Sequence, residues 1–252
     1  MTAPRFDAHC HIFNPRFRLK THLESPPAPF TIQDYRDCVV PLGFSAGVVV
    51  SSALQGCQQG HLLDALRWLG PGFVGVTQVS PMITQAELDT LNGFGIRGLR
   101  LTLRRGGTML PDQVLTLARR VHGHSGWHTE LAVDARELAE LEETLLQLPA
   151  LSLDHRALSR PALPTLLRLV EHGVHLKVCA PGRFSPGLAS ILRDLHEANP
   201  NALMFGSGAP LIPGQRGITK RDIDTLYDIL GDAAAQRVLW HNAFSFYRLQ
   251  TS

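Results

Sequence analysis

Eight short apolar segments alternate with amphipathic segments along almost the whole chain, and this alternation constrains the fold more than any other feature of the sequence. The predicted strands cover residues 6–13, 46–52, 73–79, 96–103, 127–133, 151–155, 174–179 and 202–206. Apolar residues recur at helical spacing in the segments between them. No linker and no shorter repeat interrupts the series, so we predict a closed parallel (β/α)8 barrel, with an open doubly wound sheet as the alternative.

Composition agrees with a single domain of this kind over residues 1–252. Of the 252 residues, 44% are hydrophobic and 18% are charged, which is enough for a full core. The formal net charge of +2 gives no reason to expect a nucleic-acid partner. No apolar run approaches the ~20 residues of a membrane span, and the first strand follows closely on Met1. The four scattered cysteines indicate reduced thiols, so a cytoplasmic protein is predicted, and its oligomeric state is left open.

The first predicted strand carries two histidines, His9 and His11. Alternate side chains of a strand leave on the same face, so the two imidazoles are expected to point the same way. The opposite face, directed at the outer helices, is expected to carry Phe6, Ala8, Cys10 and Ile12. Asn14-Pro15 follows at once and places His11 at the carboxyl end of the strand, where barrel enzymes hold their reactive groups. Residues 14–30 are irregular and rich in proline, and we interpret them as a lid or rim loop.

Further polar side chains fall at or just beyond the carboxyl ends of later strands: Arg100, Arg104, Glu130, His155, Arg160, Lys177 and Arg183. We expect His9, His11 and His155 to converge above the barrel axis, where three imidazoles could bind one zinc ion and leave a fourth position for water. The arginines and Lys177 would bind a small anionic substrate through paired N–H donors. The alternatives are that His155 caps a strand end, that the arginines form a solvated rim, and that Lys177 merely pairs with Glu130.

Residues 7–13 resemble the opening of the amidohydrolase-related barrels of the amidohydrolase 2 type, within them the branch that includes 2-pyrone-4,6-dicarboxylate lactonase. Residues 98–100, 126–128, 153–155, 177–181 and 238–243 fall where that group has similar segments. The resemblance implies hydrolysis of a C–O, C–N or sometimes a C–C bond. It implies a divalent metal in many members, and in the pyrone lactonase a metal-free mechanism in which arginines bind the two carboxylates of the substrate.

The chain departs from that family pattern at its eighth strand. There the family has Gly-Thr/Ser-Asp-Trp-Pro, with the aspartate as general base or metal ligand, and this chain has Gly-Ser-Gly-Ala-Pro, so that Gly208 replaces the aspartate. The tyrosine that the lactonase has on its fifth strand is Ala132 here. Glycine cannot accept a proton, and loss of a general base typically reduces the rate ~10²–10⁴-fold. Three hypotheses follow: a hydrolase of a small anionic lactone or other cyclic ester or amide in which Glu130 replaces the base, a binding protein that has lost catalysis, and a decarboxylase or other lyase.

Overall fold

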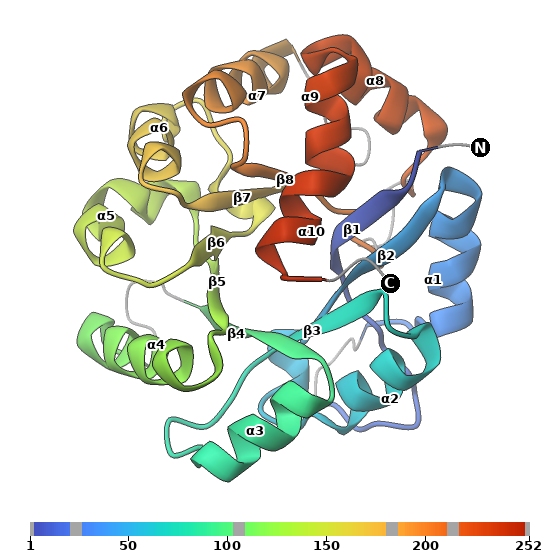
Figure 1. Ribbon diagram of the computed structural model, residues 1–252, viewed down its shortest axis with the longest axis vertical. Helices are drawn as coiled ribbons and strands as arrows, with labels where there is room; N and C mark the ends of the chain where they lie inside the picture. Colours follow the sequence, from blue (N-terminus) through green and yellow to red (C-terminus); the bar gives the residue numbers. More distant parts are fainter. Residues whose placement is uncertain (1–2, 21–26, 103–108, 180–185, 211–216, 250–252) are drawn as a thin grey trace.

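The structure is a computed structural model that describes residues 3–20, 27–102, 109–179, 186–210 and 217–249. Eight parallel strands follow one another in the order β1 to β8 in a single sheet, and the helices form a ring around it (Figure 1). The main chain beyond β8 meets β1 through two hydrogen bonds: Gly208 N donates to His9 O (2.8 Å), and His11 N donates to Ala209 O (2.7 Å). The predicted single (β/α)8 barrel is therefore confirmed, and the open sheet is wrong.

The elements keep the predicted order with shorter bounds. The strands are β1 (Arg5–Cys10), β2 (Phe44–Val50), β3 (Phe73–Thr77), β4 (Ile96–Thr102), β5 (His128–Ala132), β6 (Leu151–Leu153), β7 (His175–Val178) and β8 (Leu203–Phe205). The α-helices are α1 (Ile32–Val39), α2 (Gly60–Leu69), α3 (Gln85–Gly93), α4 (Pro111–Ser125), α5 (Leu138–Leu146), α6 (Leu163–Glu171), α7 (Pro186–Ala198), α8 (Lys220–Leu230), α9 (Asp232–Gln236) and α10 (Asn242–Phe246). Short helical turns are η1 (Val40–Leu42), η2 (Ala53–Gln55), η3 (Ala135–Glu137), η4 (His155–Ala157) and η5 (Arg237–His241).

Local sequence explains where several helices begin. Thr31 caps α1: its hydroxyl accepts a hydrogen bond from Asp34 N (3.3 Å), and its own N donates to the Asp34 carboxylate (2.7 Å). Thr84 and Glu87 make the same reciprocal pair at α3. Such a capping box satisfies N–H groups that the first helical turn leaves without partners. In the part of the chain that the structure describes, no helix has both the length and the apolar character needed to cross a membrane.

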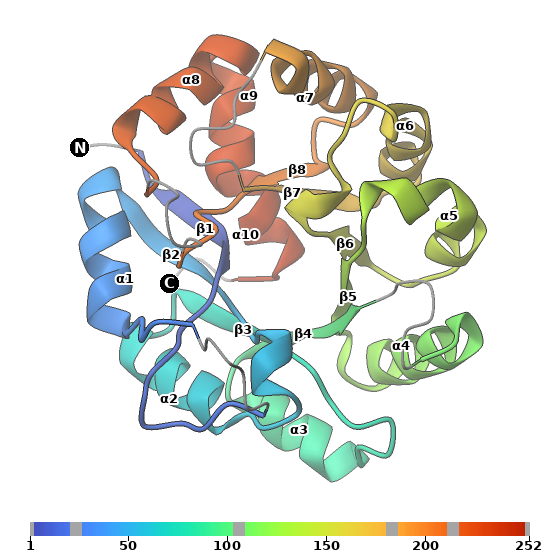
Figure 2. The same cartoon turned by 180° about the vertical axis from the view of Figure 1, so that it is seen from behind.

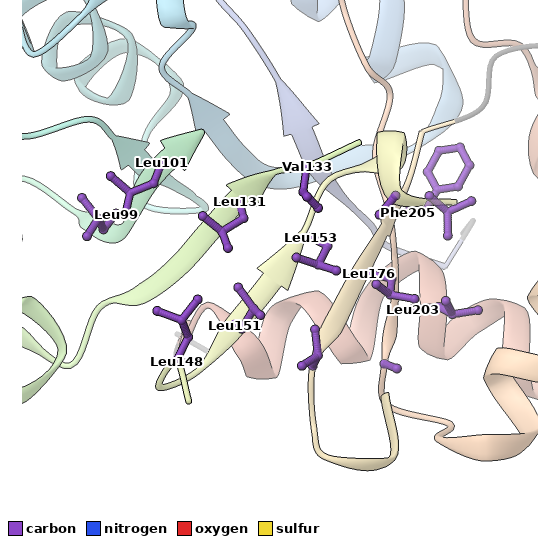
Figure 3. Close-up of a cluster of buried hydrophobic side chains, with 14 of the residues drawn as sticks. Leu99, Leu101, Leu131, Val133, Leu148, Leu151, Leu153, Leu176, Leu203 and Phe205 are labelled. Carbon is purple, nitrogen blue, oxygen red and sulfur yellow. The ribbon is translucent and has the colours of Figure 1, made fainter. Parts of the chain in front are cut away.

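The strands bury two separate sets of side chains. Outward-facing leucines and other apolar residues of β4 to β8 pack under the helices, among them Leu131, Leu153 and Leu176 (Figure 3). The alternate residues face the barrel interior, as the two-residue period of a strand requires. The interior is closed at the amino ends of the strands by α10, which lies across the centre of the ring in Figure 1 and behind the strands in Figure 2.

The interior has an apolar half and a polar half. The apolar half comes from β1, β2, β3 and β8 and includes Phe6, Ala8, Ala46, Val48, Val50, Val74, Val76 and Met204. The polar half comes from β4 to β7 and consists of Arg100, His128, Glu130, Ser152 and Lys177, all buried. Tyr247, which follows α10, contacts both halves: its ring stacks on Phe6 at 5.5 Å and lies 5.1 Å from the ring of His128.

One expectation for β1 is half wrong. Cys10 and Ile12 face the outer helices as predicted, but Phe6 and Ala8 belong to the interior cluster. The pairing of β1 with β2 shifts register between Asp7 and Cys10, and such a bulge reverses the alternation of side chains. This shift allows β1 to supply apolar side chains to the barrel core and, further along, histidines to its carboxyl end.

Candidate active site

The structure brings the three predicted histidines together at the carboxyl ends of the strands, called the mouth below. His9 belongs to β1, His11 follows it, and His155 begins η4 after β6. The ring centroids of His9 and His11 are 4.9 Å apart, and those of His9 and His155 are 5.7 Å apart. These three side chains are called the imidazole cluster from here on. His155 follows His9 and His11 by almost 150 positions in the sequence. The rule that places reactive groups at strand ends was sufficient to predict their proximity.

Burial keeps the imidazoles of His9 and His11 neutral. It lowers the pKa of His9 well below its usual range, and the nearby Lys177 ammonium lowers it further. It lowers the pKa of His11 to about 4, with the Arg100 guanidinium as the next contribution. Nδ1 of His11 lies 2.7 Å from the carbonyl oxygen of Val50. A neutral ring that donates from Nδ1 to this carbonyl leaves its Nε2 lone pair available to a substrate or water.

A buried ion network lies beside the imidazole cluster. The two carboxylate oxygens of Glu130 have different partners: Oε1 accepts from Arg100 Nη1, and Oε2 accepts from Lys177 Nζ. Glu130 and Lys177 are completely buried, and Arg100 is 9% exposed. Burial raises the pKa of Glu130, but Lys177 and Arg100 outweigh it, so that the net shift is downward. The alternative that Lys177 pairs with Glu130 is what the structure shows, and an ionised carboxylate with both oxygens bound to cations is a weak proton acceptor.

Arg100 also reaches a second carboxylate, Asp154. Its Nη2 lies 3.5 Å from Asp154 Oδ2, and Asp154 Oδ1 accepts a hydrogen bond from Arg156 N (3.1 Å) at the start of η4. Burial raises the pKa of Asp154, and Arg100 opposes this shift. Sequence reasoning assigned Asp154 no role, although its place at a strand end directly before His155 was a usable signal.

Asp7 is a second buried carboxylate without a predicted role. It accepts hydrogen bonds from the backbone N of His9 (3.1 Å), from the backbone N of Ser207 (2.7 Å) and from the Tyr35 hydroxyl (3.0 Å). The bond from His9 N lies within β1, and the bond from Ser207 N joins β1 to the chain after β8, where the barrel closes. Asp7 therefore fixes the backbone that carries His9, and the signal for it was an acidic residue two positions before that histidine.

The remaining predicted residues do not join the cluster or cannot be placed. Arg160 is 64% exposed in its side chain, and its Nη1 contacts Ser190 Oγ (3.2 Å) and Asp194 Oδ2 (3.4 Å) on α7. The chain turns outward after η4, so Arg160 lies in the outer helical layer away from the imidazoles. Arg104 and Arg183 are outside the described residues, as is part of the predicted lid. The described ends of that segment meet where Phe13 and Phe30 pair in antiparallel fashion.

Comparison with known proteins assigns the family. A model of the amidohydrolase family matches residues 6–249. The chain belongs to the amidohydrolase family. The 2-pyrone-4,6-dicarboxylate hydrolase of Comamonas testosteroni is 29% identical over 188 residues, which cover 70% of this chain and 59% of that protein, less than two thirds of its length. The 4-sulfomuconolactone hydrolase of Hydrogenophaga intermedia is 24% identical over 227 residues, which cover 81% of this chain and 74% of that protein.

Solved structures of the same fold agree with this assignment. An Agrobacterium tumefaciens protein in its apo form superposes with a TM-score of 0.85 at 19% identity, over 100% of this chain and 98% of that one. A probable 2-pyrone-4,6-dicarboxylic acid hydrolase from Acinetobacter baumannii with citric acid bound gives a TM-score of 0.80 at 21% identity, over 98% of this chain and 100% of that one. At these identities the likeness shows the fold alone, and the predicted family is confirmed by the family match.

Two glycines of this amidohydrolase shape the mouth next to the imidazoles. A Cβ on Gly206 would lie 2.7 Å from His9 Cβ and 2.8 Å from Cys179 Sγ, so only glycine lets β8 approach β1 this closely. Gly208 has a φ of 68°, and a Cβ there would meet Cys179 Cβ at an ordinary 3.4 Å. The position that we interpret as the family aspartate therefore has space for a Cβ, and its positive φ favours glycine.

The possible metal ligands among the described residues do not fit a divalent cation. Among the residues with described positions, no three His, Cys, Asp or Glu side chains are grouped so that they could share a metal ion. Two cations, Lys177 and Arg100, occupy the same buried region, and both are bound to Glu130, whose Oε1 lies 3.7 Å from His9 Nδ1. Gly208 adds no carboxylate. Zinc binding by His9, His11 and His155 stays a prediction that the surrounding charges oppose.

Proposed function

We propose that this amidohydrolase hydrolyses a small carboxylate-bearing lactone or a related cyclic ester or amide. Family membership supports hydrolysis, and the names of two curated relatives, a pyrone dicarboxylate hydrolase and a sulfomuconolactone hydrolase, support an anionic cyclic ester. The observation that carries the proposal is the convergence of three imidazoles beside Arg100 at the mouth of an amidohydrolase barrel.

In this proposal the imidazole cluster contacts the reacting ester group. Neutral rings such as His9 and His11 can accept a proton from water or donate a hydrogen bond to a carbonyl oxygen. The guanidinium of Arg100, held by Glu130 and Asp154, adds positive charge near the carbonyl oxygen, where negative charge develops during ester hydrolysis. We assign the carboxylates of the substrate to Arg104 and Arg183 because they follow strands that end at the mouth.

Glu130 is the predicted general base, and its surroundings support a different use. Both of its oxygens are bound, and its pKa is lowered by Lys177 and Arg100 despite burial. We therefore propose that Glu130 positions Arg100 and Lys177, and that the imidazole cluster takes the proton. If a folded Glu130→Gln variant keeps its turnover, Glu130 is a positioning residue. If kcat falls ~10²-fold or more without a change in KM, Glu130 is the general base.

Turnover of a lactone panel tests the function. Purified protein is incubated with mono- and dicarboxylated lactones, and products are identified by mass spectrometry, because hydrolysis adds the mass of one water and decarboxylation removes carbon dioxide. His155→Ala should abolish turnover, and His172→Ala, at the exposed histidine that caps the carboxyl end of α6, is the matched control. If the folded wild-type protein turns over none of the panel, hydrolysis of this substrate class is rejected.

A binding protein without catalysis is the second candidate, and the glycine at position 208 favours it. Calorimetry combined with product analysis separates the two candidates, because a binding protein would bind a dicarboxylate and release it chemically unchanged. The lyase hypothesis has no observation of its own in its favour, and the same product masses test it.

A further inference from the structure

A buried lysine lies in the barrel interior next to the imidazole cluster and shares Glu130 with it. Lys177 is fully buried on β7, its ammonium contacts Glu130 Oε2, and it lies 5.7 Å from the centroid of the Tyr247 ring. It is also the nearby charge that acts most strongly on the pKa of His9 after burial itself. The imidazole cluster therefore already has a lysine ammonium, paired with Glu130, beside it.

We propose that the imidazole cluster is closed to divalent cations and that Lys177 is the residue that excludes them. A dication would have to enter a buried region that holds Lys177 and Arg100, where water screens repulsion poorly. The nearby carboxylates have other partners: Glu130 binds both cations, Asp154 is paired with Arg100, and Asp7 accepts hydrogen bonds from Tyr35 and from the backbone of His9 and Ser207. The inference goes beyond the proposed hydrolysis, because it concerns what the site can bind and not which bond is cleaved.

Lys177 is a better candidate for this role than Arg100. Arg100 divides its charge between two carboxylates, Glu130 and Asp154, so its effect on an incoming ion is offset more than that of Lys177. Lys177 has one carboxylate partner and no contact with solvent. Removing its ammonium would also release one oxygen of Glu130, whose Oε1 already lies 3.7 Å from His9 Nδ1. These two atoms are not hydrogen-bonded, and a Glu130 carboxylate freed to move within hydrogen-bond distance of His9 would strengthen this histidine as a metal ligand.

Zinc and cobalt binding to the Lys177→Met variant test this role. Methionine keeps the length and the apolar stem of lysine and removes only the charge. We expect wild-type protein to show no stoichiometric zinc binding in calorimetry, and Lys177→Met to bind one zinc ion at least 10-fold and up to ~100-fold more tightly, the range that groups behind the ligands control. Cobalt bound by the variant should show the visible absorption of a tetrahedral site, and His155→Ala in the same background should remove it. Lys220→Met, at an exposed lysine of α8, is the matched control and should behave as wild type.

Each result decides the question without a measurement of activity. Stoichiometric, histidine-dependent zinc binding by wild-type protein would overturn the inference, whichever reaction the protein catalyses. It would also be overturned if folded Lys177→Met bound no more zinc than wild type. Should Lys177→Met fail to fold, Lys177→Gln replaces it, because its amide can still donate to Glu130 while the charge is gone. Zinc binding gained by Lys177→Gln alone supports the inference equally.

Discussion

The two halves of the barrel interior are held together by different forces. In the apolar half, Phe6, Val48 and Val76 fill the space between β1, β2 and β3 by packing. In the polar half, Arg100, Glu130 and Lys177 of β4, β5 and β7 form one ion network. Burial of apolar area stabilises a fold directly, whereas a buried ion pair often only offsets the loss of hydration of its members. The polar half therefore contributes less to stability than its number of contacts suggests, and its position next to the imidazole cluster indicates that it is retained for the site.

Removing one member of the ion network should have the largest effect. Glu130→Ala leaves Lys177 and Arg100 buried without their common partner, and such a loss costs about 3–5 kcal/mol. Val48→Ala in the apolar half removes two methyl groups and should cost about 2 kcal/mol, through lost burial and a small cavity. Urea unfolding of both variants measures the difference. If Val48→Ala is the more destabilising of the two, the network is not a connected unit and the contrast between the halves fails.

Lowering the pH should destabilise the polar half of the interior and leave the apolar half unaffected. Burial lowers the pKa of His128 to about 3 and that of His175 to about 4, below the ~6.5 of an unfolded chain. Between these values and pH 6.5 the unfolded state binds more protons than the native state, so the free energy of unfolding must rise with pH and fall as the solution is acidified.

His128→Phe removes one of these groups and keeps a ring against Phe246, which lies 4.6 Å away. When the pH is lowered from 6.5 to 5, the free energy of unfolding should fall in both proteins. The fall should be ~2 kcal/mol smaller in His128→Phe than in wild type. Unfolding curves at the two pH values give this number, and the exposed His172→Phe should leave the wild-type slope unchanged. Equal slopes in wild type and His128→Phe would mean that His128 titrates normally.

The contrast between the halves also shows what the sequence could and could not predict. The strand period and the strand-end rule were enough to predict the barrel and the meeting of His9, His11 and His155. The inward position of Phe6 depends on a register shift in β1 that has no local sequence signal. The pairing of Lys177 with Glu130 was one alternative from the sequence, whereas the contact of Glu130 with Arg100, 30 residues away, was not predicted. Arg160 faces α7 because of the turn at η4. Pairings of this kind depend on the assembled barrel and not on any segment alone.

Adding a charge on the apolar side of the mouth should have a smaller effect on stability. Gly208→Asp would place a carboxylate where β8 meets β1, with Cys179 Cβ at 3.4 Å from the new Cβ. The φ of 68° at this position is unfavourable for a residue with a side chain, so the free energy of unfolding should fall by about 1 kcal/mol. The loss is small because aspartate tolerates this region better than most residues. If the proposed hydrolysis is correct and lacks a base, kcat should rise, by up to ~10²-fold. A stable variant with unchanged kcat would mean that the imidazole cluster already supplies the proton acceptor.

The smallest effect is expected at the residue that both halves share. Tyr247 stacks on Phe6 with its ring, and its buried hydroxyl has no hydrogen-bond partner among the described residues. Tyr247→Phe keeps the ring and removes a polar group whose burial is unfavourable, so the free energy of unfolding should stay the same or rise by up to ~1 kcal/mol. Tyr247→Leu, which removes the stacking, is the comparison variant and should be less stable than wild type. A clear loss of stability in Tyr247→Phe would show that the hydroxyl is bonded to Lys177 or His128 through an ordered water, which would make the base of the barrel part of the polar half.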